Sequence, residues 1–294
     1  MHSSTVAARR YQRRPAQAQR VLRLAGCAIG LLPLLVAAII VVAPVWWTVV
    51  SSLRPPAESF SLPPQWLPLH PDWNNYLDVF RKIPYGTYVL NSAVVSICVV
   101  AGQIATATLA GYAFARFSFP GKTLLFWLIM ATLMIPLQAT IIPVFVLISK
   151  LHLNNTLGSL ILPALPTAFG TFLLRQYFMG LPNEFEEAAV IDGANQLQVF
   201  ARIYLPLAVP GMAILGILTF NGTWNDFYRP LIFLTDQQTY TVPIGIVSLF
   251  GYLSTGSVST VLAGVVLSVA IVLAIYLLGQ RYLVEGLTLG GLKS

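Results

Sequence analysis

Charged side chains are scarce in this 294-residue sequence. Asp, Glu, Lys and Arg together make up 9% of it, whereas they make up roughly 25% of an ordinary soluble domain. Hydrophobic residues make up 56% and are gathered in long apolar runs, so there is no segment that resembles a soluble domain. The sequence therefore predicts an all-α integral membrane protein.

Cysteine and histidine are equally sparse. Both cysteines, Cys27 and Cys98, fall inside apolar runs, so we expect reduced, buried side chains. The three histidines are scattered without metal-ligand spacing, and no Gly-x-Ser-x-Gly or His-Glu-x-x-His motif occurs. We expect no catalytic residue, no metal and no cofactor bound by this chain.

One stretch, Pro120-Gly121-Lys122-Thr123, ends like a phosphate-binding loop. That loop requires a glycine five residues before Gly121, where this sequence has Arg116, and it must follow a strand rather than an apolar span. We expect a loop between two spans and no nucleotide site.

The net charge of +7 is concentrated at the N-terminus, which argues against nucleic-acid binding. Basic residues before an apolar segment are typical of a topology signal that also contacts anionic lipid. The apolar run 25–50 is longer than the 7–15 residues of a signal peptide, and no small-residue cleavage site follows it. The sequence predicts an uncleaved first span. Six of the 17 basic residues precede it: Arg9, Arg10, Arg13, Arg14, Arg20 and Arg23.

Six runs are long enough to cross a bilayer, since a span needs ~20 apolar residues. They cover residues 25–50, 88–115, 123–149, 157–179, 207–234 and 258–283. The loops on the side of the termini carry twelve basic residues, and those on the other side carry five. The positive-inside rule therefore places both termini in the cytoplasm. The prediction is a basic cytoplasmic N-terminus (1–24), a first span (25–50), an extracytoplasmic loop (51–87), a transmembrane core (88–285) and a cytoplasmic tail (286–294).

Prolines inside several spans predict kinks there. A short helix is also expected in the loop between the first two spans. Kinks are tolerated where neighbouring helices satisfy the freed backbone groups. The proline-rich loop contains one amphipathic stretch, 74–81, with Trp66, Trp73 and Tyr76 suited to the headgroup region. The prolines inside spans are Pro33, Pro44, Pro136, Pro143, Pro163, Pro166 and Pro210.

Four of the ten acidic residues stand within nine positions of the cytoplasmic segment between the fourth and fifth spans. The pattern predicts two short helices: the first opens near Pro182, with Glu184, Glu186 and Glu187 at the positive end of its dipole, and ends at Gly193. The second runs from about Gln196 to Leu205-Pro206. It could be a linker on the membrane surface. Surface helices, however, usually present Lys and Arg to lipid, so an acidic face with small Ala188 and Ala189 favours docking to a basic protein partner.

This segment resembles the EAA signature of permease subunits in ABC importers that depend on binding proteins. The pattern Glu-Ala-Ala-x3-Gly-x9-Ile-x-Leu-Pro matches at Glu187, Ala188, Ala189, Gly193, Ile203, Leu205 and Pro206. The stretches 135–143, 172–178, 191–194 and 224–226 are similar to the carbohydrate branch, in particular the smaller permease of maltose-type importers. The resemblance covers residues 30–294.

The resemblance implies a multi-pass subunit of a prokaryotic cytoplasmic (inner) membrane that imports a mono- or oligosaccharide. Its partners would be a second, homologous permease, two ATPases that bind ATP and Mg²⁺, and an extracytoplasmic solute-binding protein. Glu187 would pair with a basic ATPase residue and Gly193 would permit the turn between the two helices. The coupling set expected from the segment is Glu186, Glu187, Ala188, Ala189, Asp192, Gly193, Ile203, Leu205 and Pro206.

A polar cluster near the outer end of the fifth span has two interpretations. Asp226 and Arg229 are three residues apart and could form a structural ion pair, or the cluster could line a path for sugar hydroxyls. Its members are Asn221, Trp224, Asn225, Asp226 and Arg229. Gln103 and Gln138 are weaker path candidates and favour helix–helix hydrogen bonds. The alternatives to a sugar permease are import of glycerol phosphate, a polyol or another small solute by the same architecture, and a transporter that works alone.

Overall fold

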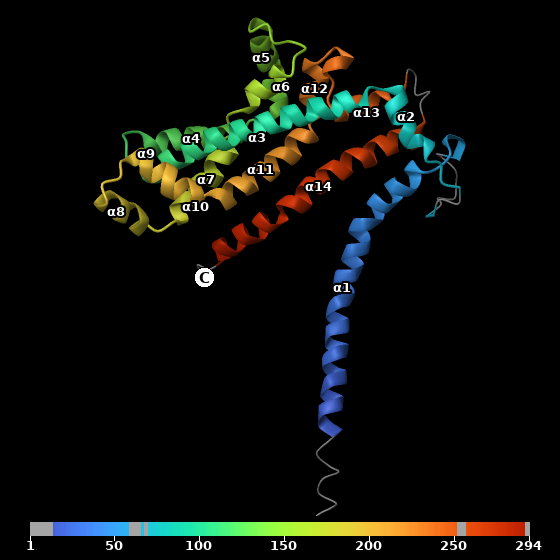
Figure 1. The fold of residues 1–294 in the computed structure, drawn as a ribbon, viewed down its shortest axis with the longest axis horizontal. Coiled ribbons are helices and arrows are strands. Elements are labelled where there is room, and N and C mark those ends of the chain that lie inside the picture. Colours follow the sequence, from blue (N-terminus) through green and yellow to red (C-terminus); the bar gives the residue numbers. More distant parts are fainter. Residues whose placement is uncertain (1–13, 59–65, 68–69, 252–256, 292–294) are drawn as a thin grey trace, which may run out of the picture.

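The computed structural model describes the backbone of residues 14–58, 66–67, 70–251 and 257–291, and the side chains of these residues except in 14–30 and 281–291. Every element within these ranges is helical (Figure 1). The longer helices are α1 (Arg14–Ser52), α2 (Asn74–Lys82), α3 (Tyr85–Arg116), α4 (Lys122–Thr132), α5 (Leu137–Lys150), α7 (Ala168–Gly180), α8 (Glu184–Ile191), α11 (Val209–Trp224) and α14 (Val258–Gly291). Shorter helices are α6 (Gly158–Ile161), α9 (Gln196–Val199), α10 (Leu205–Leu207), α12 (Tyr228–Phe233) and α13 (Val242–Ser248). The basic residues of the predicted N-terminal tail up to Arg13 and the last three residues lie outside the described part of the chain.

Three helices are long and apolar enough to cross a membrane unbroken: Leu31–Ser52 of α1, all of α3, and Val258–Gln280 of α14. Three bent pairs pass the same test of length and hydropathy, and they give up to six spans if each pair is one span. The first, second and sixth predicted spans therefore correspond to continuous helices. The last of these helices continues to Gly291, beyond the expected end at 283.

Proline accounts for the breaks in the bent pairs, because it has no backbone N–H to continue a helix. Helices α4 and α5 meet at 98° across the turn before Pro136, and α6 with its 3₁₀ extension (Leu162–Ala164) meets α7 at 43° around Pro166. Pro143 and the two prolines of α1 sit inside unbroken helices. At those three positions proline does not end the helix, and the predicted kinks there stay predictions.

The fifth predicted span, 207–234, was wrong at its outer end. Helix α11 stops at Trp224, and α12 starts separately at Tyr228. The polar residues between them provide the reason: the Asp226 carboxylate accepts hydrogen bonds from the backbone N–H groups of Tyr228 and Arg229 and so starts a new helix. The bent pair found in this region is Gln196–Leu207 with Val209–Trp224, at 66°.

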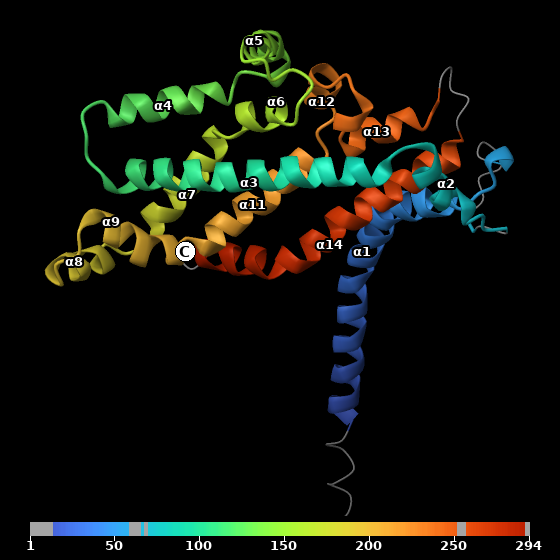
Figure 2. The same cartoon turned by 45° about the horizontal axis from the view of Figure 1, so that its top comes forward.

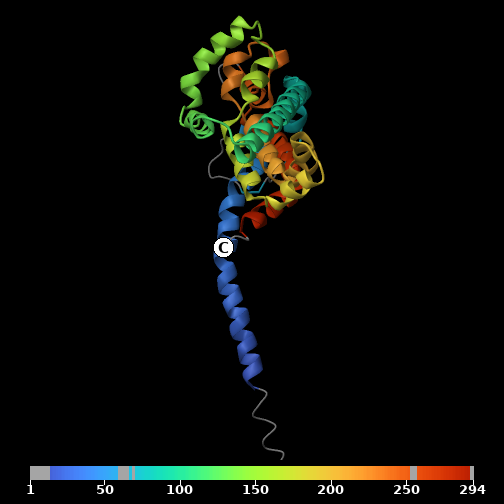
Figure 3. The same ribbon diagram turned by 90° about the vertical axis from the view of Figure 1, so that its left-hand side faces the viewer.

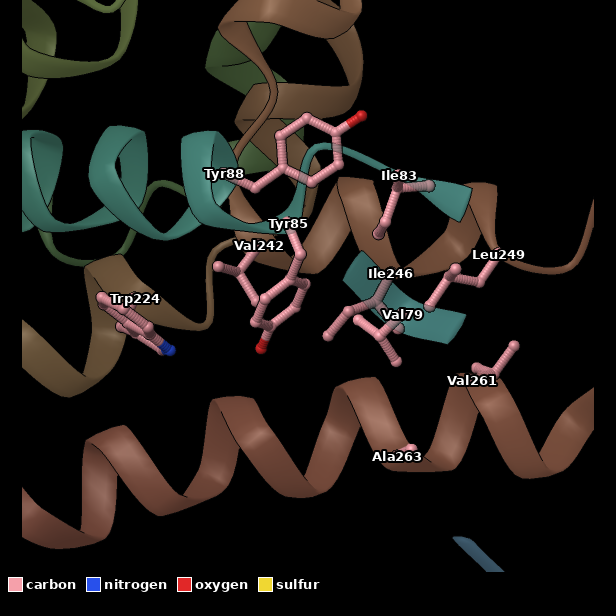
Figure 4. Packing of buried hydrophobic residues seen from close by; sticks show 10 residues of the cluster. All are labelled: Val79, Ile83, Tyr85, Tyr88, Trp224, Val242, Ile246, Leu249, Val261 and Ala263. Atoms are coloured by element: carbon pink, nitrogen blue, oxygen red, sulfur yellow. The ribbon is translucent and has the colours of Figure 1, made fainter. Parts of the chain in front are cut away.

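Helices α3, α7, α11 and α14 pack along one another, while most of α1 extends away from them (Figures 2 and 3). Figure 1 shows α8, α9, α10 and the C-terminal end of α14 at one end of this bundle and α2, α12 and α13 at the other. One buried cluster joins α2, α3, α13 and α14, with the Tyr85 hydroxyl donating to the Gly264 carbonyl at 3.1 Å (Figure 4). The predicted short amphipathic helix at 74–81 is confirmed as α2, which buries Asn75 and Val79.

Gln103 lies at the centre of the bundle and joins three elements. Its amide nitrogen donates to the Ala164 carbonyl at 2.8 Å, and its amide oxygen accepts from the Thr219 hydroxyl at 2.8 Å. Thr106, one turn further along α3, donates to the Leu165 carbonyl at 3.0 Å. The favoured interpretation of Gln103 as a helix–helix contact is confirmed. The carbonyls of Ala164 and Leu165, at the break before α7, thus accept side-chain hydrogen bonds from Gln103 and Thr106. Gln138 lies exposed on α5.

Candidate functional site

Helix α8 begins where the sequence places its acidic turn. Glu184, Glu186 and Glu187 all stand in the first turn, where their negative charge complements the helix dipole. The Asn183 carbonyl accepts the first backbone hydrogen bonds, from Glu186 at 2.9 Å and Glu187 at 3.1 Å. The Asn183 side chain makes no cap bond of its own; its amide oxygen instead accepts from the Arg116 guanidinium.

Gly193 terminates α8 in a left-handed conformation, with φ of +81°. The Gly193 N–H donates to the Val190 carbonyl at 3.0 Å and the Ala194 N–H to the Ala189 carbonyl at 2.9 Å, which is the pair of bonds of a Schellman motif. The predicted helix end at Gly193 is confirmed. A Cβ atom added there would have no atom within 4 Å, so the glycine is required by backbone conformation and not by space within this chain.

The second half of the segment starts at a capping box. The Asn195 side chain accepts from the Gln198 N–H, and the Gln198 side chain accepts from the Asn195 N–H, each at 2.9 Å. Helix α9 then passes into a π-helical turn, Phe200–Tyr204, and into α10. The expected start near Gln196 is confirmed, and the wide turn delivers the chain to Pro206 without a break.

The motif residues divide between two faces of the segment. Glu187, Ala188, Asp192 and Gly193 are exposed, whereas Ala189 is buried against the inner side of the molecule. Ile203 and Leu205 are half-buried and Pro206 is exposed. The segment also exposes large apolar side chains, notably Ile191 at 86% and Leu197 at 73% of their surface. Exposed apolar groups beside carboxylates are typical of a protein interface.

The inner side of α8 faces a polar network that the sequence did not predict. The buried Tyr204 hydroxyl donates to the Glu186 carboxylate at 3.1 Å, and the Arg116 guanidinium lies over the Tyr204 ring, 4.6 Å from its centre. Glu186 therefore has a hydrogen-bond partner within the chain, in addition to its effect on the helix dipole. A cleft of about 730 Å³ opens beside this network; it is lined by Ala115, Arg116, Asn183, Glu186, Glu187, Val190 and Ile191.

Arg116 and Lys122, two of the twelve basic residues counted on the side of the termini, also form hydrogen bonds within the chain. Arg116 donates to the carbonyls of Phe178 at 2.6 Å and Leu181 at 2.7 Å, and Lys122 donates to the Phe117 carbonyl at 2.7 Å. The available signal was Arg116 at the last position of a long apolar helix, where it could reach free carbonyls of a neighbouring helix end. Which helix end lay within reach was not in the sequence.

The outer polar cluster forms two pairs. Asn225 donates to the side-chain oxygen of Asn221 at 3.1 Å, and both are exposed. Arg229 and Asp226 form the expected ion pair, with Nε and Oδ2 2.5 Å apart and 20% and 14% of their side chains exposed. Trp224 points the other way: it is buried, and its indole N–H donates to the Ser268 hydroxyl on α14 at 3.0 Å. The structure thus pairs four of the five residues two by two, whereas Trp224 belongs to the buried cluster shown in Figure 4.

Chemically, these two sites offer binding groups. The segment 184–206 exposes carboxylates and apolar side chains, and the cluster 221–229 exposes amide groups beside an ion pair. Within the residues described, no group of three or more His, Cys, Asp or Glu side chains lies close enough together to hold a metal ion.

Comparison with known proteins gives relatives over nearly the whole chain. The arabinooligosaccharides transport system permease protein AraQ of Halalkalibacterium halodurans is 34% identical over 264 residues, which cover 87% of this chain and 93% of that protein. The sn-glycerol-3-phosphate transport system permease protein UgpE of Pectobacterium atrosepticum is also 34% identical, over 86% of this chain and 93% of its own. A chain from the crystal structure of a bacterial ABC transporter involved in alginate import has the same fold, with a TM-score of 0.75 at 22% identity; the match covers 90% of this chain and 97% of that one.

The family model of binding-protein-dependent transport system inner membrane components matches residues 103–284. That range contains both the acidic segment and the outer polar cluster. The extent of the match, together with relatives above 30% identity over most of both chains, confirms the resemblance read from the EAA signature. This chain belongs to the family of binding-protein-dependent transport system inner membrane components, the non-catalytic permease subunits of ABC importers.

Proposed function

We propose that this permease imports a mono- or oligosaccharide and that α8 is the helix through which a partner ATPase drives it. The observation that carries the proposal is the segment Glu184–Pro206. It combines a complete EAA pattern with a capped helix that exposes acidic, apolar and small side chains. A basic, apolar cleft on the ATPase is the complementary surface.

ATP binding and hydrolysis, with Mg²⁺, belong in this proposal to two partner ATPases. Closure of the ATPases would move α8 and thereby switch the permease between inward- and outward-open states. Glu187 is the exposed carboxylate that would pair with a basic ATPase residue, and Ala188 is the exposed small side chain that lets the partner approach closely.

The topology proposed is six spans, with the EAA loop and both termini in the cytoplasm. In support, α8 and the C-terminal end of α14 lie at the same end of the bundle (Figure 1). The opposite end would face an extracytoplasmic solute-binding protein. The assembly proposed is a heterodimer with a second, homologous permease that completes the path.

The outer cluster is proposed as part of the translocation path. Asn221 and Asn225 expose amide groups, which suit sugar hydroxyls. Asp226 and Arg229 would position the cluster, because their ion pair fixes the start of α12.

A second candidate is import of a small anion such as glycerol phosphate, since one relative is named as a permease for sn-glycerol 3-phosphate. Arg229 is the basic residue of the outer cluster, and the Asp226 carboxylate is bonded to it at 2.5 Å. An anion would therefore have to displace a carboxylate, so a neutral solute is favoured.

The coupling role is tested by reversing one exposed charge at a time. Glu187→Arg should abolish co-purification of the ATPase, whereas Glu184→Arg is the matched control: it is also exposed in the first turn but matches no position of the EAA pattern. Equal loss in both variants would show that only the charge of the helix start matters, and no loss in either would refute the docking role of α8.

The substrate class is tested on the reconstituted complex by the stimulation of its ATPase rate. Arabinotriose, maltose and sn-glycerol 3-phosphate serve as probes, each presented with the binding protein. We expect stimulation by a saccharide and reduced uptake by Asn225→Ala. Stimulation by glycerol phosphate alone would select the second candidate.

A further inference from the structure

Arg116 connects two parts of the molecule that the proposed coupling mechanism has to link. It is the last residue of α3, and its guanidinium donates to the carbonyls of Phe178 and Leu181, at 2.6 and 2.7 Å, at the C-terminal end of α7. The same group donates to the side chain of Asn183, which directly precedes α8. One side chain thus joins the ends of α3 and α7 to the start of the coupling helix.

The second half of the coupling segment is held by the same guanidinium. Tyr204 lies at the end of the π-helical turn, is fully buried, and has its ring under Arg116. Its hydroxyl donates back to Glu186 on α8. Tyr112 of α3 adds aromatic contacts, with ring centres 4.9 Å from Phe200 and 5.3 Å from Tyr204.

Helices α3 and α7, to which this network is attached, are packed as one body. A Cβ atom at Gly111 of α3 would lie 2.9 Å from the backbone nitrogen of Arg175, so the two backbones are in close contact. Arg175 of α7 donates to the Phe114 carbonyl of α3 at 3.2 Å, and its guanidinium lies over the Phe126 ring of α4 at 4.2 Å. Each helix therefore carries an arginine that caps the end of the other.

The two arginines differ in one respect. Both tie α3 to α7, but of the two only Arg116 also contacts the coupling segment, through Asn183 and Tyr204. The network is part-buried around the fully buried Tyr204 ring, and hydrogen bonds that involve a charged group are stronger than bonds between neutral groups, so the network resists deformation. A displacement of α8 would therefore be transmitted to α3 and α7 directly by these side chains, whereas it would reach α11 only along the backbone of α9 and α10.

We propose that Arg116 and Tyr204 form a latch that makes the coupling segment and the α3–α7 pair move as one rigid body. The latch consists of Arg116, Asn183, Glu186 and Tyr204. Arg116 and Tyr204 are positioning residues: they contact neither nucleotide nor solute. This inference rests on the proposed docking of an ATPase to α8.

The test measures a distance inside the assembled complex. Spin labels are placed at the exposed positions Glu184, on α8, and Ser118, after α3, in a full-length chain with both native cysteines replaced by alanine. The distance distribution is recorded without nucleotide and after trapping with ATP and vanadate. With the latch intact, we expect one narrow distribution that does not shift on trapping.

Two variants open the latch and one serves as the control. Arg116→Lys keeps the charge but loses the planar set of donors, and Tyr204→Phe removes only the hydroxyl bonded to Glu186. In both, the distribution should shift or broaden on trapping, and solute-stimulated ATP hydrolysis should continue with a loss of uptake per ATP. Arg175→Lys, which disturbs the contacts of α7 with α3 and α4 but not the coupling segment, should leave the distance and the coupling ratio as in the unsubstituted protein.

Each remaining outcome decides against one idea. If the unsubstituted chain already shows a shifted distance on trapping, or if Arg116→Lys and Arg175→Lys behave alike, the latch is refuted while the docking of an ATPase stands. If no ATPase co-purifies and no nucleotide is trapped with the unsubstituted chain, the proposed function fails before the latch is tested.

Discussion

Ala188 and Ala189 are neighbours in the sequence but lie on different faces of α8. Ala188 is exposed on the outer face, whereas Ala189 keeps 9% of its surface exposed and packs in the cluster formed with Leu174, Phe178 and Tyr204. From the sequence, both alanines were expected to form part of one small, acidic face that docks to a partner. The structure assigns close packing within the chain to Ala189.

This division predicts different effects of one substitution at the two positions. Ala189→Leu overfills a packed site and should destabilise the chain by about 1–3 kcal/mol, whereas Ala188→Leu on the exposed face should change its stability by no more than about 0.5 kcal/mol. Thermal denaturation of the purified permease measures both. Ala188→Leu should instead reduce co-purification of the ATPase, and an unchanged yield would show that the partner does not approach this face.

Gly193 permits a test that separates conformation from contact. Its φ of +81° makes any residue with a Cβ costly, by about 1–2 kcal/mol for non-glycine residues other than Asn, but the chain leaves open space around it. Gly193→Ala and Gly193→Leu should therefore destabilise the isolated permease equally, and Gly193→Asn less. Thermal denaturation provides that comparison.

In the complex, the same three variants should diverge. Gly193→Leu should lose transport well beyond Gly193→Ala, because the partner would occupy the space that is open in the single chain. Equal transport by Ala and Leu variants would show that the segment requires only the turn at this position, and that nothing packs against it.

At the scale of elements, the sequence predicted helix ends best, because a helix end depends on residues close to it in the chain. The end at Gly193 and the start near Gln196 are such cases. Proline was less decisive: Pro136 stands at a 98° break, while Pro143, seven residues later, lies inside a continuous helix. The difference depends on what packs nearby, and a single sequence does not contain that information.

Two features could not be predicted from the sequence for a similar reason. The break after Trp224 was hidden because the apolar residues of α12 prolong the hydropathy of α11 beyond the polar pair that interrupts it. The hydrogen bonds of Arg116 were hidden because their acceptors, the carbonyls of Phe178 and Leu181, are more than sixty residues away. Long-range partners of this kind require the fold.

Gln103 should be the most sensitive polar residue among the packed helices. Gln103→Leu removes bonds to both Ala164 and Thr219, and polar contacts between membrane helices contribute about 0.6–2 kcal/mol. We expect a loss of stability in that range by thermal denaturation. Thr219→Val, which spares the bond to Ala164, should cost less, and Gln138→Leu at an exposed site should have no measurable effect. A Gln138 variant as unstable as the Gln103 variant would contradict this assignment.

At the scale of the whole molecule, the proposed orientation can be checked with two single cysteines. Glu184 and Gln237 are both exposed, one on α8 and one between α12 and α13. In a chain with Cys27 and Cys98 replaced by alanine, a membrane-impermeant maleimide added to spheroplasts should label Gln237→Cys at once and Glu184→Cys only after lysis. The reverse pattern would invert the topology and remove α8 from the reach of a cytoplasmic ATPase.

Helix α1 has a consequence for biosynthesis. Most of its side chains between Leu31 and Val45 are exposed, whereas its last turn is buried and is tied to α2 by the Asn75 amide, which donates to the carbonyls of Ser52 at 3.0 Å and Arg54 at 2.8 Å. A ribosome delivers α1 before any of the helices that form the bundle. Because its exposed part is apolar and long enough to cross a bilayer, α1 can enter the membrane as soon as it is made and hold the growing chain there. The α2 residues that fasten it to the bundle follow a few seconds later, at a translation rate of about 5–20 residues per second.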